Sequence, residues 1–346
     1  MSKKLFDFSI GNPPYNAEFS KDGNSTYAAP VYNEFMDAAN EVADKVELIH
    51  PARFLFNAGS TPKAWNEKML HDPHFKVLHY EEDATKVFAN TDIKGGVAIT
   101  YHDNDMDFGP IEIFTPYESL NIILKKVVKN PGFLSLNSIA VSGYAYHFTE
   151  KMHKDHPEVR QYQSKGHEYD LKSNIIDKLP MIFLDECPKC EYVIIVGRSK
   201  NARVNKYVIK EYINDVINLA KYKILLPKAS GVGTFGESLA PAIVVGPGYG
   251  NTETFFSIGA FDTEEEANNL WKYLKGKFAR TMLSIMKKTQ MITPGTFLYV
   301  PLQDFTATSD IDWSKSIHEI DLQLYRKYNL SKEEIDFIET NVKEMV

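Results

Sequence analysis

The sequence has only two cysteines, Cys187 and Cys190, among its 346 residues. Two cysteines cannot form a disulfide framework, so a reducing cytoplasm is the expected location. A structural zinc site takes four protein ligands, and no second Cys-x-x-Cys or paired histidine lies nearby. The Cys187–Cys190 segment therefore predicts a turn, and we expect no metal.

Long apolar runs and an overall positive charge are also missing. No stretch approaches the ~20 apolar residues of a membrane span, and no apolar region follows the N-terminal lysines, so neither a membrane helix nor a signal peptide is expected. The net charge of −7 argues against a globally basic nucleic-acid binder but leaves room for local basic tracts. With 43% hydrophobic and 25% charged residues, the composition is that of a globular protein long enough for two domains.

The most informative stretch is Gly11-Asn12-Pro13-Pro14-Tyr15, which follows the apolar run Leu5–Ile10. Each proline removes a backbone N–H and fixes φ, so neither a helix nor a ladder strand can continue through it. We expect an extended segment whose carbonyl oxygens, together with the Asn12 side chain, lie beside the ring of Tyr15. Acceptors next to a flat apolar face suit an extruded adenine, held by its amino group and stacked from one side. The alternative is a proline-rich turn after an edge strand.

This stretch resembles the catalytic motif of DNA adenine 6-amino methyltransferases. Later segments resemble the γ-class, TaqI-like subgroup of type IIG restriction-modification enzymes: Val46–Leu55, Lys86–Asn90 leading into Gly95–Ile99, Thr252–Thr254, Phe261–Ala267, Phe297–Phe305 and Tyr328–Ile338. The resemblance implies a catalytic motif of Asn12, Pro13, Pro14 and Tyr15. It also implies that Tyr15 and Phe88 stack on a base flipped out of double-stranded DNA, and that S-adenosylmethionine donates the methyl group. Without the resemblance, Phe88 is interpreted as a core residue at a loop edge.

The pattern predicts an α/β fold in two parts. Residues 1–110 alternate strand and helix, with strands expected at Leu5–Ile10, Lys45–Ile49, Phe75–Tyr80 and Gly96–Tyr101. Such alternation predicts a mostly parallel sheet, here part of a Rossmann-like methyltransferase sheet. A helix beginning at Pro30 is expected to place Val31, Phe35, Ala38, Ala39 and Val42 on one face. Residues 111–346 lose the alternation and are interpreted as an α+β target-recognition, DNA-binding domain.

The resemblance also points to something missing. The γ-class order places a glycine-rich strand-to-helix turn, which binds S-adenosylmethionine, before the catalytic motif, yet only eleven residues precede Asn12. The later Val244–Asn251 has no helix directly after its glycines, and Gly95-Gly96 is better explained as a turn. We therefore expect an incomplete cofactor site and an open apolar edge at Leu5–Ile10. A second polypeptide, a second copy or a C-terminal stretch is expected to cover that edge.

Two basic tracts stand out. Arg198–Lys228 has eight basic residues against two acidic ones, and Lys272–Lys288 has six against none. The second tract is expected on a long helix begun by Asp262, with Glu265 in a capping-box position. One-sided positive charge on an acidic protein indicates phosphate contact, although a solvated helix face is the alternative. The DNA-binding candidates are Arg203, Lys206, Lys228, Lys272, Lys275, Arg280 and Lys287.

Two functions remain open at this stage. The first is a site-specific DNA adenine methyltransferase of the restriction-modification type, either whole or one half of a split enzyme. The second is a catalytically inactive DNA-binding or specificity module of a restriction or phage-defence system. The intact Asn12–Tyr15 and Phe88 favour the first, and the missing glycine-rich turn favours the second. A nuclease lacks support, because no convincing carboxylate-and-lysine cluster falls on one element.

Overall fold

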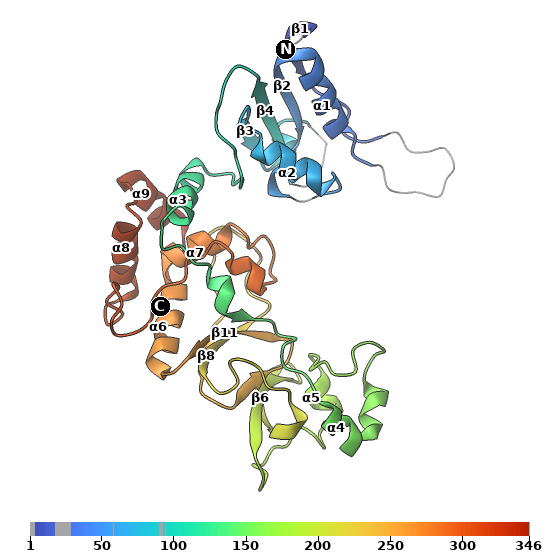
Figure 1. Cartoon of the computed structure of the whole chain (residues 1–346), viewed down its shortest axis with the longest axis vertical. Coiled ribbons are helices and arrows are strands. Elements are labelled where there is room, and N and C mark those ends of the chain that lie inside the picture. The colour runs from blue at the N-terminus through green and yellow to red at the C-terminus, as the bar shows by residue number, and fades with distance from the viewer. Residues whose placement is uncertain (1–3, 18–28, 58, 90–92, 94, 346) are drawn as a thin grey trace. The chain divides into compact units, whose positions relative to one another are not determined.

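A computed structural model of the chain describes residues 4–17, 29–57, 59–89, 93 and 95–345 (Figure 1). The chain divides into two compact units, residues 1–121 and 122–346. The division falls within helix α3 (Glu118–Val128), whereas the sequence prediction places it after residue 110.

The first unit contains a four-stranded sheet with the strand order β1-β2-β4-β3. Its strands are β1 (Phe6–Gly11), β2 (Ala43–Pro51), β3 (Phe75–Glu81) and β4 (Val97–Asp103), which confirms the four predicted strands. β1 and β2 are parallel and are connected through helix α1 (Tyr32–Val42), as a parallel pair requires. β4 is antiparallel to both β2 and β3, so the expectation of a mostly parallel sheet is wrong for the β3–β4 half. Between β3 and β4 the described residues contain only the 3-10 turn η2 (Ala84–Lys86), which is too short for a parallel crossover.

The core of this unit is aromatic. Tyr32 stacks on His50 with ring centroids 5.8 Å apart, and it also contacts the ring of Phe54. Trp65 of helix α2 (Lys63–His71) joins them from the side. Tyr32 and Met36, which lie one helical turn apart on α1, are both buried in this cluster. α1 therefore buries a different face from the predicted one. Phe35, predicted to be buried, is 46% exposed.

Strand β1 forms one edge of the sheet. It pairs with β2 on one side, and no described residue pairs with its other side. Four large apolar side chains are exposed along or next to it: Leu5 (77%), Phe6 (58%), Phe8 (61%) and Ile10 (76%). The predicted open apolar edge is therefore present in the described part of the chain.

The second unit combines two sheets with helices gathered in its C-terminal part (Figure 1). The strands are β5 (Ala140–Val141), β6 (Tyr192–Ser199), β7 (Ala202–Ile209), β8 (Tyr222–Pro227), β9 (Ile243–Val245), β10 (Tyr249–Asn251) and β11 (Phe255–Phe261). The helices after α3 are α4 (Glu150–Asp155), α5 (Ile175–Lys178), α6 (Glu264–Lys275), α7 (Lys277–Ser284), α8 (Ile317–Lys327) and α9 (Lys332–Asn341). The sheet orders are β10-β6-β7 and β5-β11-β8-β9, and α6 packs against β8, β9 and β11. All pairs but the parallel β10–β6 pair are antiparallel, which agrees with the predicted α+β character of this part.

The predicted long basic helix is two helices. α6 begins one residue later than predicted, because Thr263 and Glu266 form the capping box. The helix ends at Gly276, where the carboxylate of Asp321 accepts hydrogen bonds from the backbone N–H groups of Lys277 (2.8 Å) and Phe278 (3.0 Å) and so caps α7. A Cβ at Gly276 would lie 2.7 Å from Asp321 Oδ1, so the approach requires glycine. Side chains of α6 and α7 therefore do not share one continuous face.

Candidate functional site

The Asn-Pro-Pro-Tyr loop (residues 12–15) leaves the carboxyl end of β1. In open α/β sheets, ligands bind outside the carboxyl ends of the strands, and parallel β1 and β2 end on the same side here. The backbone N–H of Val31 donates to the Tyr15 carbonyl at 3.1 Å, which fixes the loop to the start of α1. Pro13 and Pro14 prevent the segment between β1 and Tyr15 from forming a helix or pairing in the sheet, as predicted.

The two predicted acceptors are available for a ligand. The Asn12 side chain is exposed, and no described residue forms a hydrogen bond with it or with the Pro13 carbonyl. An exposed amide oxygen and a carbonyl oxygen one residue apart can both accept from a single NH₂ group.

The structure brings together the two rings that the family resemblance pairs. Tyr15 and Phe88 have ring centroids 6.3 Å apart with an interplanar angle of 70°, so they meet edge to face. A base stacked between them needs parallel rings with a wider gap, so one ring must rotate before a base can enter. The Tyr15 hydroxyl is buried without a hydrogen-bond partner among the described residues, and burial raises the pKa of Tyr15. Asn90, which ends the Lys86–Asn90 segment of the family resemblance, lies outside the described residues.

Other residues of the resembling segments have structural roles. His50 is fully buried, its Nε2 lies 2.7 Å from Thr100 Oγ1, and burial lowers its pKa to about 4, so it is a neutral core residue. Gly96 has a φ of +75°, and a Cβ there would lie 2.3 Å from the Glu81 carbonyl oxygen. This confirms that Gly95-Gly96 serves a turn and close packing.

The Val244–Asn251 segment does not have the form of an S-adenosylmethionine-binding turn. In the Val244–Asn251 segment, β10 follows the glycines where a cofactor-binding turn would lead into a helix. A Cβ at Gly250 would lie 2.9 Å from both Ile195 Cδ1 and Tyr146 Cδ1, so this glycine is needed for packing inside the second unit. The described residues also contain no group of three or more His, Cys, Asp or Glu arranged to hold a metal ion. Of the described helices, none has the length and apolar character needed to cross a bilayer.

The basic residues predicted to contact DNA have different environments. Arg203 is exposed on the β6–β7 hairpin and Lys228 is half-buried just after β8, and both line one cavity. Lys206 pairs with Asp185. On α6, Lys272 donates to the Trp313 carbonyl at 2.9 Å and Lys275 is half-buried.

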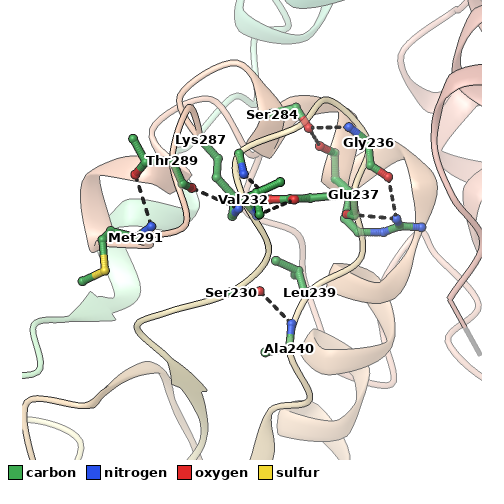
Figure 2. Close-up of polar contacts among 12 residues, drawn as sticks. Ser230, Val232, Gly236, Glu237, Leu239, Ala240, Ser284, Lys287, Thr289 and Met291 are labelled. Carbon is green, nitrogen blue, oxygen red and sulfur yellow. Dashed lines mark hydrogen bonds and ion pairs between the residues drawn. The ribbon is translucent and has the colours of Figure 1, made fainter.

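The prediction that Arg280 and Lys287 contact DNA is wrong, because both side chains are buried. Arg280 is 1% exposed, donates to four backbone carbonyls, those of Lys275, Gly236, Glu237 and Lys343, and has its pKa lowered to about 10 by burial. Lys287 is 4% exposed and pairs with Glu237 (Figure 2). The prediction assumed that one unbroken helix carries the whole basic tract, and the break at Gly276 places Arg280 and Lys287 beyond the helix that carries Lys272 and Lys275.

Sequence reasoning missed three residues that lie with Arg203 and Lys228. Arg198, Tyr144 and Glu253 line the same cavity. Arg198 belongs to the first basic tract, so its charge was visible. Tyr144 and Glu253 come from distant parts of the chain, and no local pattern connects them to the tract.

Comparisons with known proteins match the first unit to one family. Residues 1–88, which include the Asn-Pro-Pro-Tyr loop and Phe88, match the family model of the Eco57I restriction-modification methylase. This match ends at residue 88 and covers no residue of the second unit. No curated protein matches the chain.

Two solved structures are similar to the chain at low identity. One is the type IIG restriction endonuclease BpuSI, with 10% identity over 96% of this chain and 52% of that chain, and a TM-score of 0.37. The other is the ATP-dependent Type ISP restriction-modification enzyme LlaBIII bound to DNA, with 11% identity over 82% of this chain and 28% of that chain, and a TM-score of 0.26. The chain thus spans about half the length of the BpuSI chain.

Proposed function

We propose that this chain is the adenine-binding and DNA-recognition part of a DNA adenine 6-amino methyltransferase of the restriction-modification type, with S-adenosylmethionine as the methyl donor. One observation carries the proposal. Asn12 lies exposed and without a described hydrogen-bond partner at the carboxyl end of a parallel strand. It precedes Tyr15, whose ring contacts that of Phe88, in the segment that matches a methylase family.

Methyl transfer to the adenine amino group needs hydrogen-bond acceptors near that group more than it needs a general acid or base. The amino lone pair of adenine is delocalised into the ring, so the nitrogen is a poor nucleophile. Two hydrogen bonds from its N–H groups to the Asn12 side-chain oxygen and the Pro13 carbonyl favour a pyramidal nitrogen, and they stabilise the positive charge that develops as it attacks the methyl group. S-adenosylmethionine, when bound, would supply the methyl group as its sulfur–methyl bond breaks, and the proton of the amino group would pass to water.

The two rings hold the extruded base. Stacking on an aromatic side chain is worth ~1–3 kcal/mol per base. Extruding a base costs a few kcal/mol, so stacking on Tyr15 and Phe88 offsets much of that cost. In this proposal Phe88 rotates out of its edge-to-face contact with Tyr15, and the base enters between the two rings.

The proposal also assigns a role to the open edge of β1. Exposed Phe6, Phe8 and Ile10 side chains form an apolar strip on a strand with free backbone groups. A strand from a second polypeptide or a second copy pairs there and completes the sheet. In this proposal the protein that completes the sheet also supplies the part of the donor site that the family resemblance places before the catalytic motif.

The test is Asn12→Ala with Asn16→Ala as the matched control, because Asn16 is an exposed asparagine just beyond the loop. Transfer of labelled methyl groups to unmethylated DNA is measured together with duplex affinity, on the chain mixed with the product of its neighbouring gene. We expect Asn12→Ala to abolish N6-methyladenine formation and to leave duplex affinity within about twofold, and Asn16→Ala to change neither. Methylation that survives in Asn12→Ala would rule out the proposed mechanism.

A second candidate is a catalytically inactive DNA-binding or specificity module, since Gly246 and Gly248 lead into strand β10 and not into the helix that follows a donor-binding turn. Calorimetry with S-adenosylmethionine separates the two, using the chain alone and mixed with the product of its neighbouring gene. Binding that the mixture restores supports a split methyltransferase. Binding in neither sample supports the module.

A further inference from the structure

The second unit contains a cavity of about 610 Å³ beside the β6–β7 hairpin and the end of β8. Three cationic side chains line it, Arg198, Arg203 and Lys228, against one carboxylate, Glu253. A concentration of positive charge of this kind is unusual on a chain whose net charge is −7. It indicates an anionic ligand.

The two arginines occupy neighbouring positions at which their like charges repel each other. Arg198 and Arg203 are directly opposite each other in the β6–β7 ladder. Like charges at opposed positions destabilise an antiparallel pair, so an anion between them relieves a repulsion already present. Within the described residues, the Arg198 guanidinium donates one hydrogen bond, to the Asn201 carbonyl at 3.3 Å, and the Arg203 guanidinium donates none. Since each guanidinium has five N–H donors, most of these donors are left for a ligand.

Among the described residues, the Glu253 carboxylate forms no ion pair with either arginine, and its hydrogen bonds go to other groups. Glu253 Oε1 accepts from the Ser173 backbone N–H (2.9 Å) and hydroxyl (3.0 Å). Burial alone would raise the pKa of Glu253, but hydrogen bonds from Tyr144 and Ser173 outweigh it and keep the group ionised. The same bond to Glu253 raises the pKa of Tyr144 to about 12. Lys228 Nζ lies 4.7 Å from the centroid of the Tyr144 ring, so Glu253 and Tyr144 together position this third cation.

Another part of the wall is held by a hydrogen bond. Ala240 and Met291 line the cavity, and Ala240 lies next to Ser230 at the base of the loop shown in Figure 2. The Ala240 N–H donates to Ser230 Oγ at 2.7 Å, which closes the loop at its neck. A preformed wall lowers the ordering cost of binding.

We propose that this cavity binds a phosphodiester group of a DNA strand, with Arg198 and Arg203 donating to the phosphate oxygens and Lys228 adding a third positive charge. The planar fork of guanidinium matches phosphate geometry, which favours arginine at the two opposed positions. The inference deepens the proposed function, since DNA is the source of the phosphate. Free phosphate would present the same chemistry.

The test measures duplex affinity by fluorescence anisotropy across a range of salt concentrations, using the full chain. The variant is Arg198→Gln/Arg203→Gln. The control is Arg160→Gln/Lys165→Gln, which removes the same charge from exposed positions of the second unit that do not line the cavity. We expect the double variant to bind at least about tenfold more weakly and to lose about two from the slope of log affinity against log salt, while the control keeps its slope. Arg198→Lys/Arg203→Lys should keep the slope and lose affinity, because it keeps the charge without the fork.

Each remaining outcome overturns the inference. An unchanged slope in Arg198→Gln/Arg203→Gln, or a loss of the same size in the control, removes the cavity from the DNA interface. Inorganic phosphate is the second arm. A response to phosphate that the glutamine variant abolishes, with no variant effect on duplex, assigns the cavity to free phosphate. Repeating the slopes in the Asn12→Ala background keeps this test independent of methyl transfer, so failure of one proposal is not read as failure of the other.

Discussion

Lys287 and Glu237 form an ion pair in the interior of the second unit, with side chains 3% and 10% exposed (Figure 2). The Glu237 carboxylate also accepts from the backbone N–H groups of Val232 (2.8 Å) and Gly233 (2.9 Å). Burial alone would raise the pKa of Glu237, but these bonds and the Lys287 ammonium hold it below its usual value. The glycine-rich loop from Ser230 to Glu237 therefore depends on a buried pair of charges.

Removing one member of this pair should destabilise the protein strongly. In Lys287→Met the Glu237 carboxylate stays buried without its cation, which typically costs about 3–5 kcal/mol. We expect a loss of that size in the free energy of unfolding, measured by urea denaturation. Lys275→Met is the control: it removes a half-buried lysine whose side chain has no hydrogen bond or ion pair among the described residues, and should stay within about 0.5 kcal/mol of wild type. Equal stability of Lys287→Met and wild type would contradict the buried pair.

The same variant tests the corrected role of Lys287. Because its ammonium is turned inward to Glu237, Lys287→Met should leave the salt dependence of duplex binding unchanged wherever the variant is folded. A folded variant with a flattened salt slope would return Lys287 to the DNA interface.

The contributions of the Tyr15 ring and of its hydroxyl can be measured separately with two variants. Its hydroxyl is buried without a described partner, so Tyr15→Phe should raise stability by up to about 1 kcal/mol and keep methyl transfer. Tyr15→Ala removes the stacking surface and should weaken retention of a flipped base by ~1–3 kcal/mol. Thermal denaturation checks the first effect and methyl incorporation the second. If Tyr15→Phe loses methyl transfer as completely as Tyr15→Ala, the hydroxyl has a role that stacking does not explain.

The apolar edge of β1 predicts association. The wild-type chain should form a complex with itself or with the product of its neighbouring gene, detected by light scattering. A charge on an edge strand prevents strand pairing, so Ile10→Lys should abolish that complex. Leu78→Lys is the matched control, since Leu78 is 48% exposed on β3, the other edge of the same sheet, and this variant should still associate. A wild-type chain that stays monomeric with and without the neighbouring product would contradict the prediction.

Much of the fold could be read from local patterns. The four strands of the first unit and the capping box of Ser331 and Glu334 follow from residues that are neighbours in sequence. The Asn-Pro-Pro-Tyr loop was readable for the same reason, because two prolines restrict their own backbone whatever surrounds them. The open edge at β1 followed from the position of the catalytic strand in the resembling family.

What could not be predicted depends on long-range contacts. Helical periodicity cannot show that Asp321, which is far along the chain, caps a new helix at Gly276, and this contact ends the continuity on which the basic face rested. The buried face of α1 was set by stacking of Tyr32 on His50, a pairing across two elements. The cavity around Arg198 and Glu253 likewise joins segments that are distant in sequence. Charge counts located the basic tracts but could not tell Arg203, which is exposed, from Lys287, which is buried.

Lys223 supplies a pH-dependent prediction. It is fully buried at the start of β8, donates to the Asn218 carbonyl at 2.7 Å, and burial lowers its pKa to about 7. In the unfolded chain this lysine keeps its proton up to about pH 10.4. Between these values the unfolded state binds more protons, so raising the pH favours the folded state.

Wild type should therefore gain about 2 kcal/mol of stability relative to Lys223→Met between pH 7 and pH 9. The difference between the two proteins cancels the other titrating groups, and Lys221→Met, which removes a half-buried lysine paired with Asp262, should show no such trend. A difference that is constant over this pH range would mean that Lys223 stays charged in the folded protein.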